Sequence, residues 1–454
     1  YALCPDVGKH YFCTPPKNRH YMELSEIYEL YLKHKAVTTD SRDCPEGSIF
    51  FALRGDNFDG NAYASKALEQ GCAYAVVDEE QYAVKGDPRY ILVKNSLDTM
   101  QQLAHLHRVT LGLPVIQITG TNGKTTTKEL VSAVLEKKYK TLHTEGNLNN
   151  HIGVPKPLLR LTGKHQVAVI ETGANHPGEI ALLSKITDPD FGIITNVGRA
   201  HLEGFGSFEG VVRTKCELYD YLRAKKNTTV FLNGDSDILQ RMSEGLETVS
   251  YGTQPGKDLA VEGNVIDCTP YLSFRWREKG KEWQYVTTRM IGSYNISNLL
   301  AAIAVGLKFN VPVADINSAL AGYVPSNNRS QLVKTVRNTL IVDAYNANPT
   351  SMMAALENFA RMHADNKMVI LGQMNELGKE SVEEHRKVVD FLDKAGFGEV
   401  WLVGENFSGI APQYRTFENE TEVENAIKAG DISGRTILIK GSNSNKLYKL
   451  ADIL

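Results

Sequence analysis

The chain has 454 residues, of which 42% are hydrophobic and 23% are charged. This composition is typical of a globular protein, and at ~100–200 residues per domain the length allows about three domains. The formal net charge of −3 leaves no broad basic surface for wrapping nucleic acid, so an anionic substrate must be bound by local clusters of charge. No apolar run in the sequence approaches the ~20 residues that span a bilayer.

The six cysteines are scattered along the chain, at Cys4, Cys13, Cys44, Cys72, Cys216 and Cys268. They form no Cys-x-x-Cys pair, which favours free thiols in a reducing compartment over a disulfide framework or a zinc site. We therefore expect a cytoplasmic protein. Residues 1–21 lack hydrophobic periodicity, and we interpret them as an extension outside the fold.

Residues 40–78 alternate short strand-like runs with glycine turns, which predicts a compact α/β unit. Ser41, Arg42 and the turn at residues 54–60 put hydrogen-bond donors and a guanidinium group at strand ends, where a diphosphate or a sugar can bind. A solvated turn with a surface arginine accounts for the same residues.

A glycine-rich loop stands between an apolar, β-rich run at residues 115–119 and an amphipathic helix. The loop consists of Gly120, Thr121, Asn122, Gly123, Lys124, Thr125 and Thr126. Its glycines let backbone N–H groups face a phosphate, the helix N-terminus adds partial positive charge, Lys124 adds a point charge, and the hydroxyls that follow can reach Mg²⁺. The loop is shorter than the common P-loop, but it predicts a nucleotide triphosphate site. The alternative is an ordinary turn with a surface lysine.

Strand-like and helical segments alternate from residue 114 onward, which predicts a doubly wound parallel sheet. Its strands are expected at residues 115–119, 167–171, 192–196 and 229–232. Ligands of such sheets collect beyond the carboxyl ends of the strands.

Two residues near those ends are candidates for a site, and two more residues lie in helical segments. Glu171 ends one strand, where it can bind Mg²⁺ or lie at the surface, and His201 follows another, as a ligand or a structural histidine. Lys215 lies in a helical segment with the pattern of a solvated lysine. Asn295 opens an alanine-rich helix, where its amide can hold an adenine edge or cap the helix.

The C-terminal third carries a second βα series. Residues 258–288 alternate polar and apolar positions, which predicts a small antiparallel insert, and residues 325–329 form a polar junction before the new series begins. We expect a three-domain α/β protein. After the extension at residues 1–21, it comprises a small α/β domain at 22–108, a central nucleotide-binding domain at 109–324 and a Rossmann-like domain at 325–454.

Together, these residues resemble the motifs of the Mur ligases, the ATP-dependent enzymes that build the peptide stem of bacterial peptidoglycan and so serve cell-wall synthesis, cell shape and cell division. The matching positions, in order across nearly all of residues 22–454, are the loop 120–126, Glu171, the segment 196–201, Lys215, Asn295, Arg329 and Asp343. Residues 146–155, 173–180 and 345–349 are most similar to the members that add D-alanyl-D-alanine to UDP-N-acetylmuramoyl-tripeptide.

Two alternatives stay open. The sister enzyme that adds the third amino acid usually carries an Asp-Asn-Pro-Arg segment, which is missing from this sequence. The other alternative is a nucleotide-dependent switch without ligase chemistry.

The resemblance implies an ADP-forming ligase that works through an acyl phosphate, with Lys124, Glu171, His201 and Lys215 as its catalytic residues. ATP would be bound by the loop together with Asn295, Arg329 and Asp343. A pair of Mg²⁺ ions would be held by Thr125, Glu171, His201 and Lys215, with Lys215 carbamylated. Substrate would be bound by Ser41, Arg42, Asn147, Asn150, Tyr345, Asn346 and Asn348, with UDP on the N-terminal domain. The expected partners are UDP-N-acetylmuramoyl-tripeptide and D-alanyl-D-alanine, with no nucleic acid and no membrane span, and we expect a monomer.

The sequence departs from the family pattern at two positions. Asn328 precedes Arg329 where many relatives have glycine, and Asn443 stands where arginine is common. The second departure weakens the inference on how the carboxylate of the dipeptide or of the third residue is held. We also expect the junction at residues 325–329 to act as a hinge.

Overall fold

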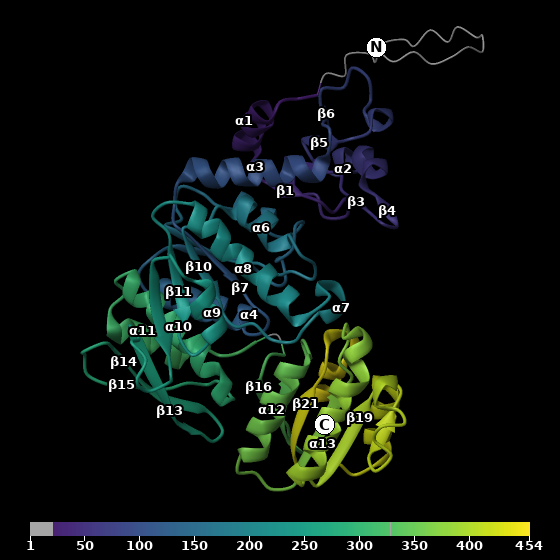
Figure 1. Cartoon of the computed structure of the whole chain (residues 1–454). Helices are drawn as coiled ribbons and strands as arrows, with labels where there is room; N and C mark the ends of the chain where they lie inside the picture. Colours follow the sequence, from purple (N-terminus) through teal and green to yellow (C-terminus); the bar gives the residue numbers. More distant parts are fainter. Residues whose placement is uncertain (1–20, 327) are drawn as a thin grey trace, which may run out of the picture. The chain divides into compact units, whose positions relative to one another are not determined.

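The computed structural model describes residues 21–326 and 328–454 (Figure 1). The expected extension, apart from Tyr21, lies outside the described residues, and so does Asn327 of the expected hinge. Within the described ranges, no helix has both the length and the apolar character needed to cross a membrane. The chain divides into two compact units, one ending at Leu106 and the other formed by His107–Leu454.

The N-terminal unit is built on a parallel four-stranded sheet, in the order β1 (Val37–Thr38), β2 (Ile49–Phe51), β5 (Tyr74–Val77) and β6 (Tyr90–Leu92). Helices α1 (Leu24–His34) and α2 (Ala64–Glu69) belong to this unit, and α3 (Ser96–Leu111) begins in it. The turn expected at residues 54–60 is a separate hairpin of β3 (Arg54–Gly55) and β4 (Phe58–Asp59). The predicted α/β unit is confirmed.

The central sheet has nine strands, in the order β15-β14-β13-β12-β11-β10-β7-β9-β8. The strands are β7 (Val115–Thr119), β8 (Thr141–His143), β9 (Val167–Glu171), β10 (Phe191–Ile194), β11 (Thr229–Asn233), β12 (Thr248–Gly252), β13 (Val261–Cys268), β14 (Leu272–Glu278) and β15 (Gln284–Thr287). All neighbours from β8 to β13 pair in parallel. The first strand, β7, lies between β9 and β10, so the strand order reverses there, as in a doubly wound fold.

The antiparallel strands predicted at residues 258–288 are present as β13, β14 and β15, but they belong to the central sheet. β13 pairs in parallel with β12, and β14 and β15 extend the same sheet in antiparallel register. The predicted alternation is correct, since Leu272, Phe274 and Trp276 are buried while the residues between them are partly exposed. Mixed pairing at one edge of a parallel sheet is common, and pattern alone does not reveal which sheet a strand joins.

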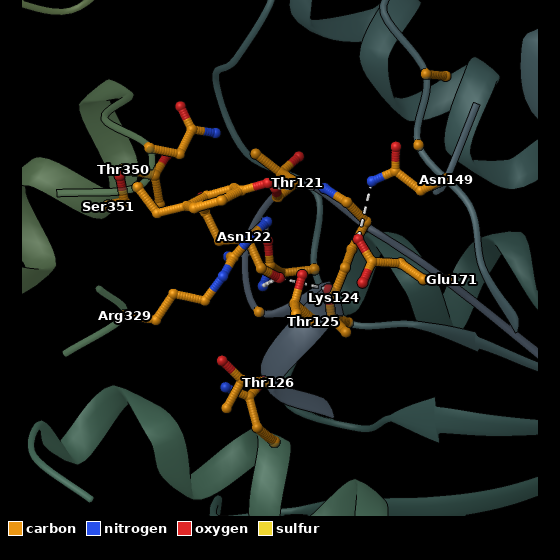
Figure 2. Close-up of a pocket in the computed structure, with 18 of the residues that line it drawn as sticks. Thr121, Asn122, Lys124, Thr125, Thr126, Asn149, Glu171, Arg329, Thr350 and Ser351 are labelled. Carbon is orange, nitrogen blue, oxygen red and sulfur yellow. Dashed lines mark hydrogen bonds between the residues drawn. The ribbon is translucent and has the colours of Figure 1, made fainter. Parts of the chain in front are cut away.

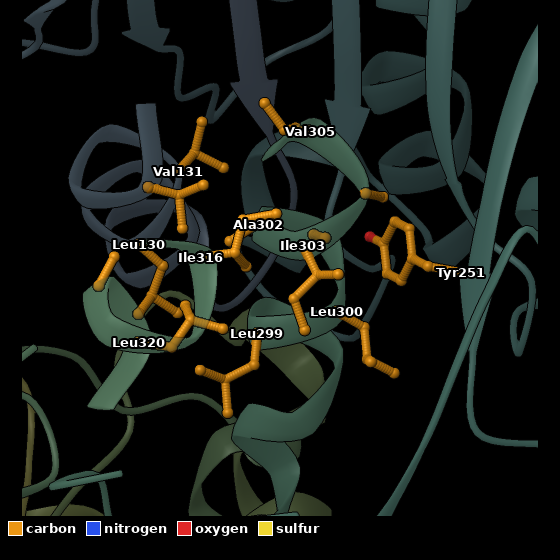
Figure 3. Packing of buried hydrophobic residues seen from close by; sticks show 14 of the residues in the cluster. Leu130, Val131, Tyr251, Leu299, Leu300, Ala302, Ile303, Val305, Ile316 and Leu320 are labelled. Carbon is orange, nitrogen blue, oxygen red and sulfur yellow. The ribbon is translucent and has the colours of Figure 1, made fainter. Parts of the chain in front are cut away.

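One face of the central sheet is covered by α4 (Lys124–Leu135), α10 (Ile296–Lys308) and α11 (Val313–Gly322) (Figure 3). The remaining helices of this region are α5 (Pro155–Leu159), α6 (Glu179–Thr187), α7 (Leu202–Phe205), α8 (Phe208–Ala224) and α9 (Asp237–Met242). Leu130 of α4, Leu299 of α10 and Ile316 of α11 meet in a single hydrophobic cluster with the sheet. Because α4 begins at the glycine-rich loop, this cluster fixes the helix whose first turn faces the loop.

The C-terminal sheet has six strands, in the order β16 (Gln331–Lys334), β17 (Thr339–Asp343), β21 (Thr436–Lys440), β18 (Lys367–Gly372), β19 (Glu399–Val403) and β20 (Arg415–Phe417). Within this sheet, only β16 pairs in antiparallel register. The helices of the C-terminal region are α12 (Pro349–Arg361), α13 (Ser381–Ala395) and α14 (Glu420–Ala429). Separate hydrophobic clusters pack on the two faces of this sheet. A parallel sheet covered on both faces is the predicted Rossmann-like arrangement.

The cluster around α10 generates a stability prediction. Leu299 is fully buried, so Leu299→Ala removes apolar contacts and leaves a cavity. We expect the free energy of unfolding of the central region to fall by about 2–5 kcal/mol, measured by urea unfolding. Val336 is fully exposed, and Val336→Ala is the matched control, expected to lie within about 0.5 kcal/mol of the unsubstituted chain. Equal effects of the two substitutions would contradict this assignment of the core.

Candidate functional site

A cavity of about 590 Å³ opens within the His107–Leu454 unit, beyond the carboxyl ends of β7 and β9 (Figure 2). This is the point where the strand order reverses, and doubly wound folds bind their ligands there. The lining includes Thr121, Asn122, Gly123, Lys124, Thr125 and Thr126 of the loop, Asn149, Glu171, His201 and Asn295 of the central region, and Arg329, Asp343, Tyr345, Asn346 and Thr350 of the C-terminal region. Most residues expected to bind the nucleotide are thus brought together.

The glycine-rich loop joins β7 to α4, as the sequence predicts. The backbone φ of Gly120 is +143°, and a Cβ atom there would lie 2.0 Å from Oγ1 of Thr195, so only glycine fits. Nζ of Lys124 donates hydrogen bonds to the carbonyl oxygens of Gly120, at 2.8 Å, and Thr121, at 3.1 Å. Burial lowers the pKa of Lys124, and the carboxylate of Glu171 partly offsets this. The lysine therefore lies inside the loop and lines the cavity, unlike the surface lysine of an ordinary turn.

Glu171 is the last residue of β9 and is only 1% exposed, so its interpretation as a surface strand end is wrong. Its Oε1 atom accepts a hydrogen bond of 2.9 Å from Nδ2 of Asn149, but Oε2 is buried without a hydrogen-bond partner (Figure 2). A buried polar atom without a partner is costly, and buried carboxylates usually meet a cation or a donor. The free oxygen makes Glu171 a candidate ligand for a cation that arrives with the substrate.

His201 lies beyond β10, at the start of α7, and also lines the cavity. Its Nδ1 atom hydrogen-bonds the carboxylate of Glu376 from the C-terminal region. Burial lowers the pKa of His201, and the carboxylate of Glu376 partly offsets this. Within the described ranges, no three His, Cys, Asp or Glu side chains cluster in a way that would hold a metal ion. A cation bound here would have few protein ligands, the arrangement that Mg²⁺ adopts when phosphate oxygens and waters complete its shell.

The sequence pattern of Lys215 predicts a solvated helix lysine, and this prediction is wrong because the side chain is buried. It lies on α8 but is only 2% exposed, with Nζ 3.4 Å from the carbonyl oxygen of Ala174 and 5.3 Å from the ring centre of Phe205. Burial, and next the charge of Lys124, lowers the pKa of Lys215 to about 7. A substantial fraction of this amine is therefore neutral at neutral pH.

The other residues expected to bind ATP, Asn295, Arg329 and Asp343, lie around the same cavity. Asn295 stands at the N-cap of α10, but its side chain makes no cap bond, and its Nδ2 atom donates to the carbonyl oxygen of Ile291 at 2.8 Å. The guanidinium of Arg329 lies over the ring of Tyr345, with 3.8 Å between the guanidinium carbon and the ring centre. Asp343 ends β17 and accepts a hydrogen bond of 2.6 Å from Nζ of Lys440. Residues of two sheets therefore face one space.

The expected substrate residues are only partly at the cavity. Tyr345, Asn346 and Asn150 line it, but Oδ1 of Asn150 accepts hydrogen bonds from the backbone N–H groups of its own turn. Asn147 and Asn348 are not among the lining residues. Sequence reasoning missed Asn149, the asparagine that contacts Glu171, because spacing does not tell which of several neighbouring asparagines turns inward.

The other expected substrate residues belong to the N-terminal unit. Ser41 is buried, while Arg42 is exposed. Arg42 forms a bidentate ion pair with Asp40, in which Nε donates to Oδ1 at 2.9 Å and Nη2 donates to Oδ2 at 2.8 Å. Arg54 pairs with Asp78 at 2.7 Å. Both guanidinium groups thus have internal carboxylate partners.

Comparisons with known proteins agree with this architecture. Three family models of Mur ligase domains match the chain. They are "Mur ligase family, catalytic domain" at residues 33–108, "Mur ligase middle domain" at 118–306 and "Mur ligase, glutamate ligase domain" at 328–443. A protein of Bacillus subtilis named UDP-N-acetylmuramoyl-tripeptide–D-alanyl-D-alanine ligase is 34% identical, over 93% of each chain. The chain belongs to the Mur ligase family.

Two further relatives support the family assignment. The Escherichia coli protein of the same name is 33% identical over 92% of this chain and 93% of its own. A crystal structure of MurF from Acinetobacter baumannii superposes with a TM-score of 0.84 at 30% identity, over 92% of this chain and 93% of that chain. The three-domain α/β fold expected for this Mur ligase is confirmed.

The burial of Lys215 predicts a pH dependence of stability. Its pKa is about 7 in the folded chain and near 10.5 when solvated, so between these values only the unfolded chain binds the proton. Stability conferred by this position therefore rises with pH over that window. We expect the melting temperature of the unsubstituted chain, relative to that of Lys215→Gln, to rise between pH 7 and pH 9. Lys185→Gln, which removes an exposed charge, is the control, and a difference independent of pH would contradict the lowered pKa.

Proposed function

We propose that this chain is an ATP-dependent ligase that joins D-alanyl-D-alanine to UDP-N-acetylmuramoyl-tripeptide, with release of ADP and phosphate. The observation that carries the proposal is a single cavity in which Lys124 of the loop and Glu171, with an unpartnered oxygen, lie with Arg329 and Tyr345 of the C-terminal region. The names of relatives that are 29–34% identical over most of their length support the substrates.

The chemistry explains why such a site needs both regions. A free carboxylate is a poor acceptor for an amine, so a carboxylate oxygen of the tripeptide attacks the γ-phosphorus of ATP and the bond to the β-phosphate oxygen breaks. The neutral amine of the dipeptide then attacks the acyl carbon of the resulting acyl phosphate. The tetrahedral intermediate loses the amine proton to solvent, and phosphate leaves. The first step brings two anions together. Lys124 and the backbone N–H groups of the loop offset that repulsion and stabilise the charge of the transferring phosphoryl group.

The residues present fit a divalent cation. When bound, Mg²⁺ would neutralise phosphate charge between the loop and the acceptor carboxylate. Thr125, whose hydroxyl lies at the start of α4, and Glu171, through its free oxygen, are its proposed ligands, with His201 and a carbamylated Lys215 completing a pair of metal sites. Carbamylation consumes a neutral amine, forms a bond to the carbon of CO₂ and releases a proton. The lowered pKa of Lys215 supports it, because the neutral form is available.

The remaining assignments follow from the family. The N-terminal unit would bind the UDP moiety around Ser41, Arg42 and the β3–β4 hairpin, and Tyr345 and Asn346 would contact the dipeptide. The domain limits proposed at residues 22–108, 109–324 and 325–454 follow the three large sheets. We propose that the enzyme acts as a cytoplasmic monomer, with the junction before Arg329 as its hinge.

The proposed reaction requires both acceptors. We expect phosphate release from ATP only when UDP-N-acetylmuramoyl-tripeptide and D-alanyl-D-alanine are present together, measured by a coupled phosphate assay. A panel that varies the third residue of the tripeptide and the dipeptide identifies the preferred substrates. Release that is indifferent to both substrates would favour a nucleotide switch. Ligation of a single amino acid to a dipeptide precursor would favour the sister reaction.

The loop lysine provides a second test. Lys124→Ala removes the ammonium that faces the cavity, and we expect ligase activity to fall by at least about a thousandfold, since charge stabilisation of the phosphoryl group is lost. The circular dichroism spectrum should stay unchanged, because Lys124 is the first residue of α4 and lines the cavity, outside the hydrophobic cluster that holds the helix. Lys137→Ala, at an exposed lysine just beyond α4, is the control and should keep full turnover. Turnover retained in Lys124→Ala would remove the loop from the mechanism.

A further inference from the structure

Two asparagine side chains join the glycine-rich loop to the C-terminal region. Nδ2 of Asn348 donates to Oδ1 of Asn122 at 2.8 Å, and Nδ2 of Asn122 donates to Oδ1 of Asn348 at 3.3 Å. The two residues are 226 positions apart in sequence, and Asn348 is only 4% exposed. A reciprocal amide pair between a buried and a partly buried side chain holds its two backbones in a defined register.

Both partners are anchored in their own regions. The backbone N–H of Asn122 donates to Oδ1 of Asn196 at 3.0 Å, and its carbonyl oxygen accepts from Oγ1 of Thr195 at 2.6 Å, so the end of β10 fixes the loop. Asn348 is the N-cap of α12, where Oδ1 also accepts from the backbone N–H of Ser351 at 2.9 Å. The amide pair therefore connects a fixed loop to a fixed helix end.

A second contact supports the same junction. A Cβ atom on Gly198 would lie 2.9 Å from Oγ1 of Thr350, in the first turn of α12, and 3.5 Å from Cγ2 of Thr121. The start of α12 thus packs directly against the segment that follows β10. Figure 2 shows Thr350, Ser351 and Asn122 among the residues that line the cavity. Tyr345 and Asn346, which line the cavity, come just before α12, so the position of this helix decides where they lie.

We propose that Asn348 is a positioning residue that couples the nucleotide loop to the C-terminal region. The amide of Asn348 is used within the protein, so it acts through Asn122 rather than on substrate. When the pair forms, Arg329, Asp343 and Tyr345 are held opposite Lys124, and a nucleotide in the cavity contacts both regions at once. Loss of the pair leaves each region folded but lowers the affinity for a nucleotide that contacts both regions. The kinetic part of this inference rests on the proposed ligase function, whereas the binding part does not.

The variant Asn348→Ser tests the proposal, because serine caps a helix as well as asparagine does but is too short to reach Asn122. Isothermal titration calorimetry with Mg²⁺ and the β,γ-imido analogue of ATP measures nucleotide affinity without ligation. We expect affinity to fall about tenfold, the effect of losing two hydrogen bonds of ordinary net strength. In an Asn122→Ala background, Asn348→Ser should cause no further loss, since the pair is already broken.

The matched control is Asn419→Ser, which makes the same exchange at the N-cap of α14, where Asn419 accepts from the backbone N–H of Glu422. This variant should keep the nucleotide affinity of the unsubstituted chain.

A second experiment disturbs the same junction at Gly198, where the segment after β10 contacts the start of α12. Gly198→Ala should weaken nucleotide binding in the same way, and Thr350→Ala added to it should restore binding, because it removes the hydroxyl that the new methyl group meets.

Kinetics separate positioning from the other roles of Asn348. At saturating ATP, we expect Asn348→Ser to keep kcat and the KM for D-alanyl-D-alanine within about twofold, with the KM for ATP raised. A raised KM for the dipeptide with unchanged nucleotide affinity would make Asn348 a substrate contact and overturn the proposal. Independent effects of Asn122→Ala and Asn348→Ser would also overturn it. A chain that binds nucleotide but ligates nothing would refute the proposed function. The calorimetric double-mutant cycle would still test the coupling between Asn122 and Asn348.

Discussion

The site depends on the placement of the Lys124 ammonium and the Glu171 carboxylate at the same end of the central sheet. Lys124 is placed there by the turn from β7 into α4, and Glu171 by the end of the neighbouring strand β9. Parallel pairing of the two strands carries both residues to one edge, so the site follows directly from sheet register. The helix that starts at Lys124 is held by the cluster around Leu299, which means that packing far from the cavity sets the direction of the loop.

Much of this arrangement is readable from the sequence. β7 and β9 begin and end where their apolar runs predict, and β11 differs by one residue, because strands buried on both faces are continuous hydrophobic segments bounded by polar residues. The third predicted strand is the exception. It was expected to include Thr195 and Asn196, but β10 ends at Ile194, and these two polar residues turn to hold the loop. Their role depends on a contact more than 70 positions away in sequence, which periodicity does not record.

The side chains that the sequence misjudged share one cause. Lys215 has the spacing of an exposed helix lysine, yet α8 turns it toward Ala174 and Phe205, and only the packing of neighbouring segments decides that. Asn149 lies in a segment rich in asparagine, where residue type is uniform and orientation differs. Burial and orientation of single polar side chains are tertiary properties, whereas strand and helix patterns are local.

The hydrogen bonds that Lys124 makes to the carbonyl oxygens of its own loop have a consequence for the entry of a nucleotide. These bonds restrict the rotamers of the lysine before any nucleotide binds. An incoming phosphate therefore meets a preorganised site, and little side-chain entropy is lost on association.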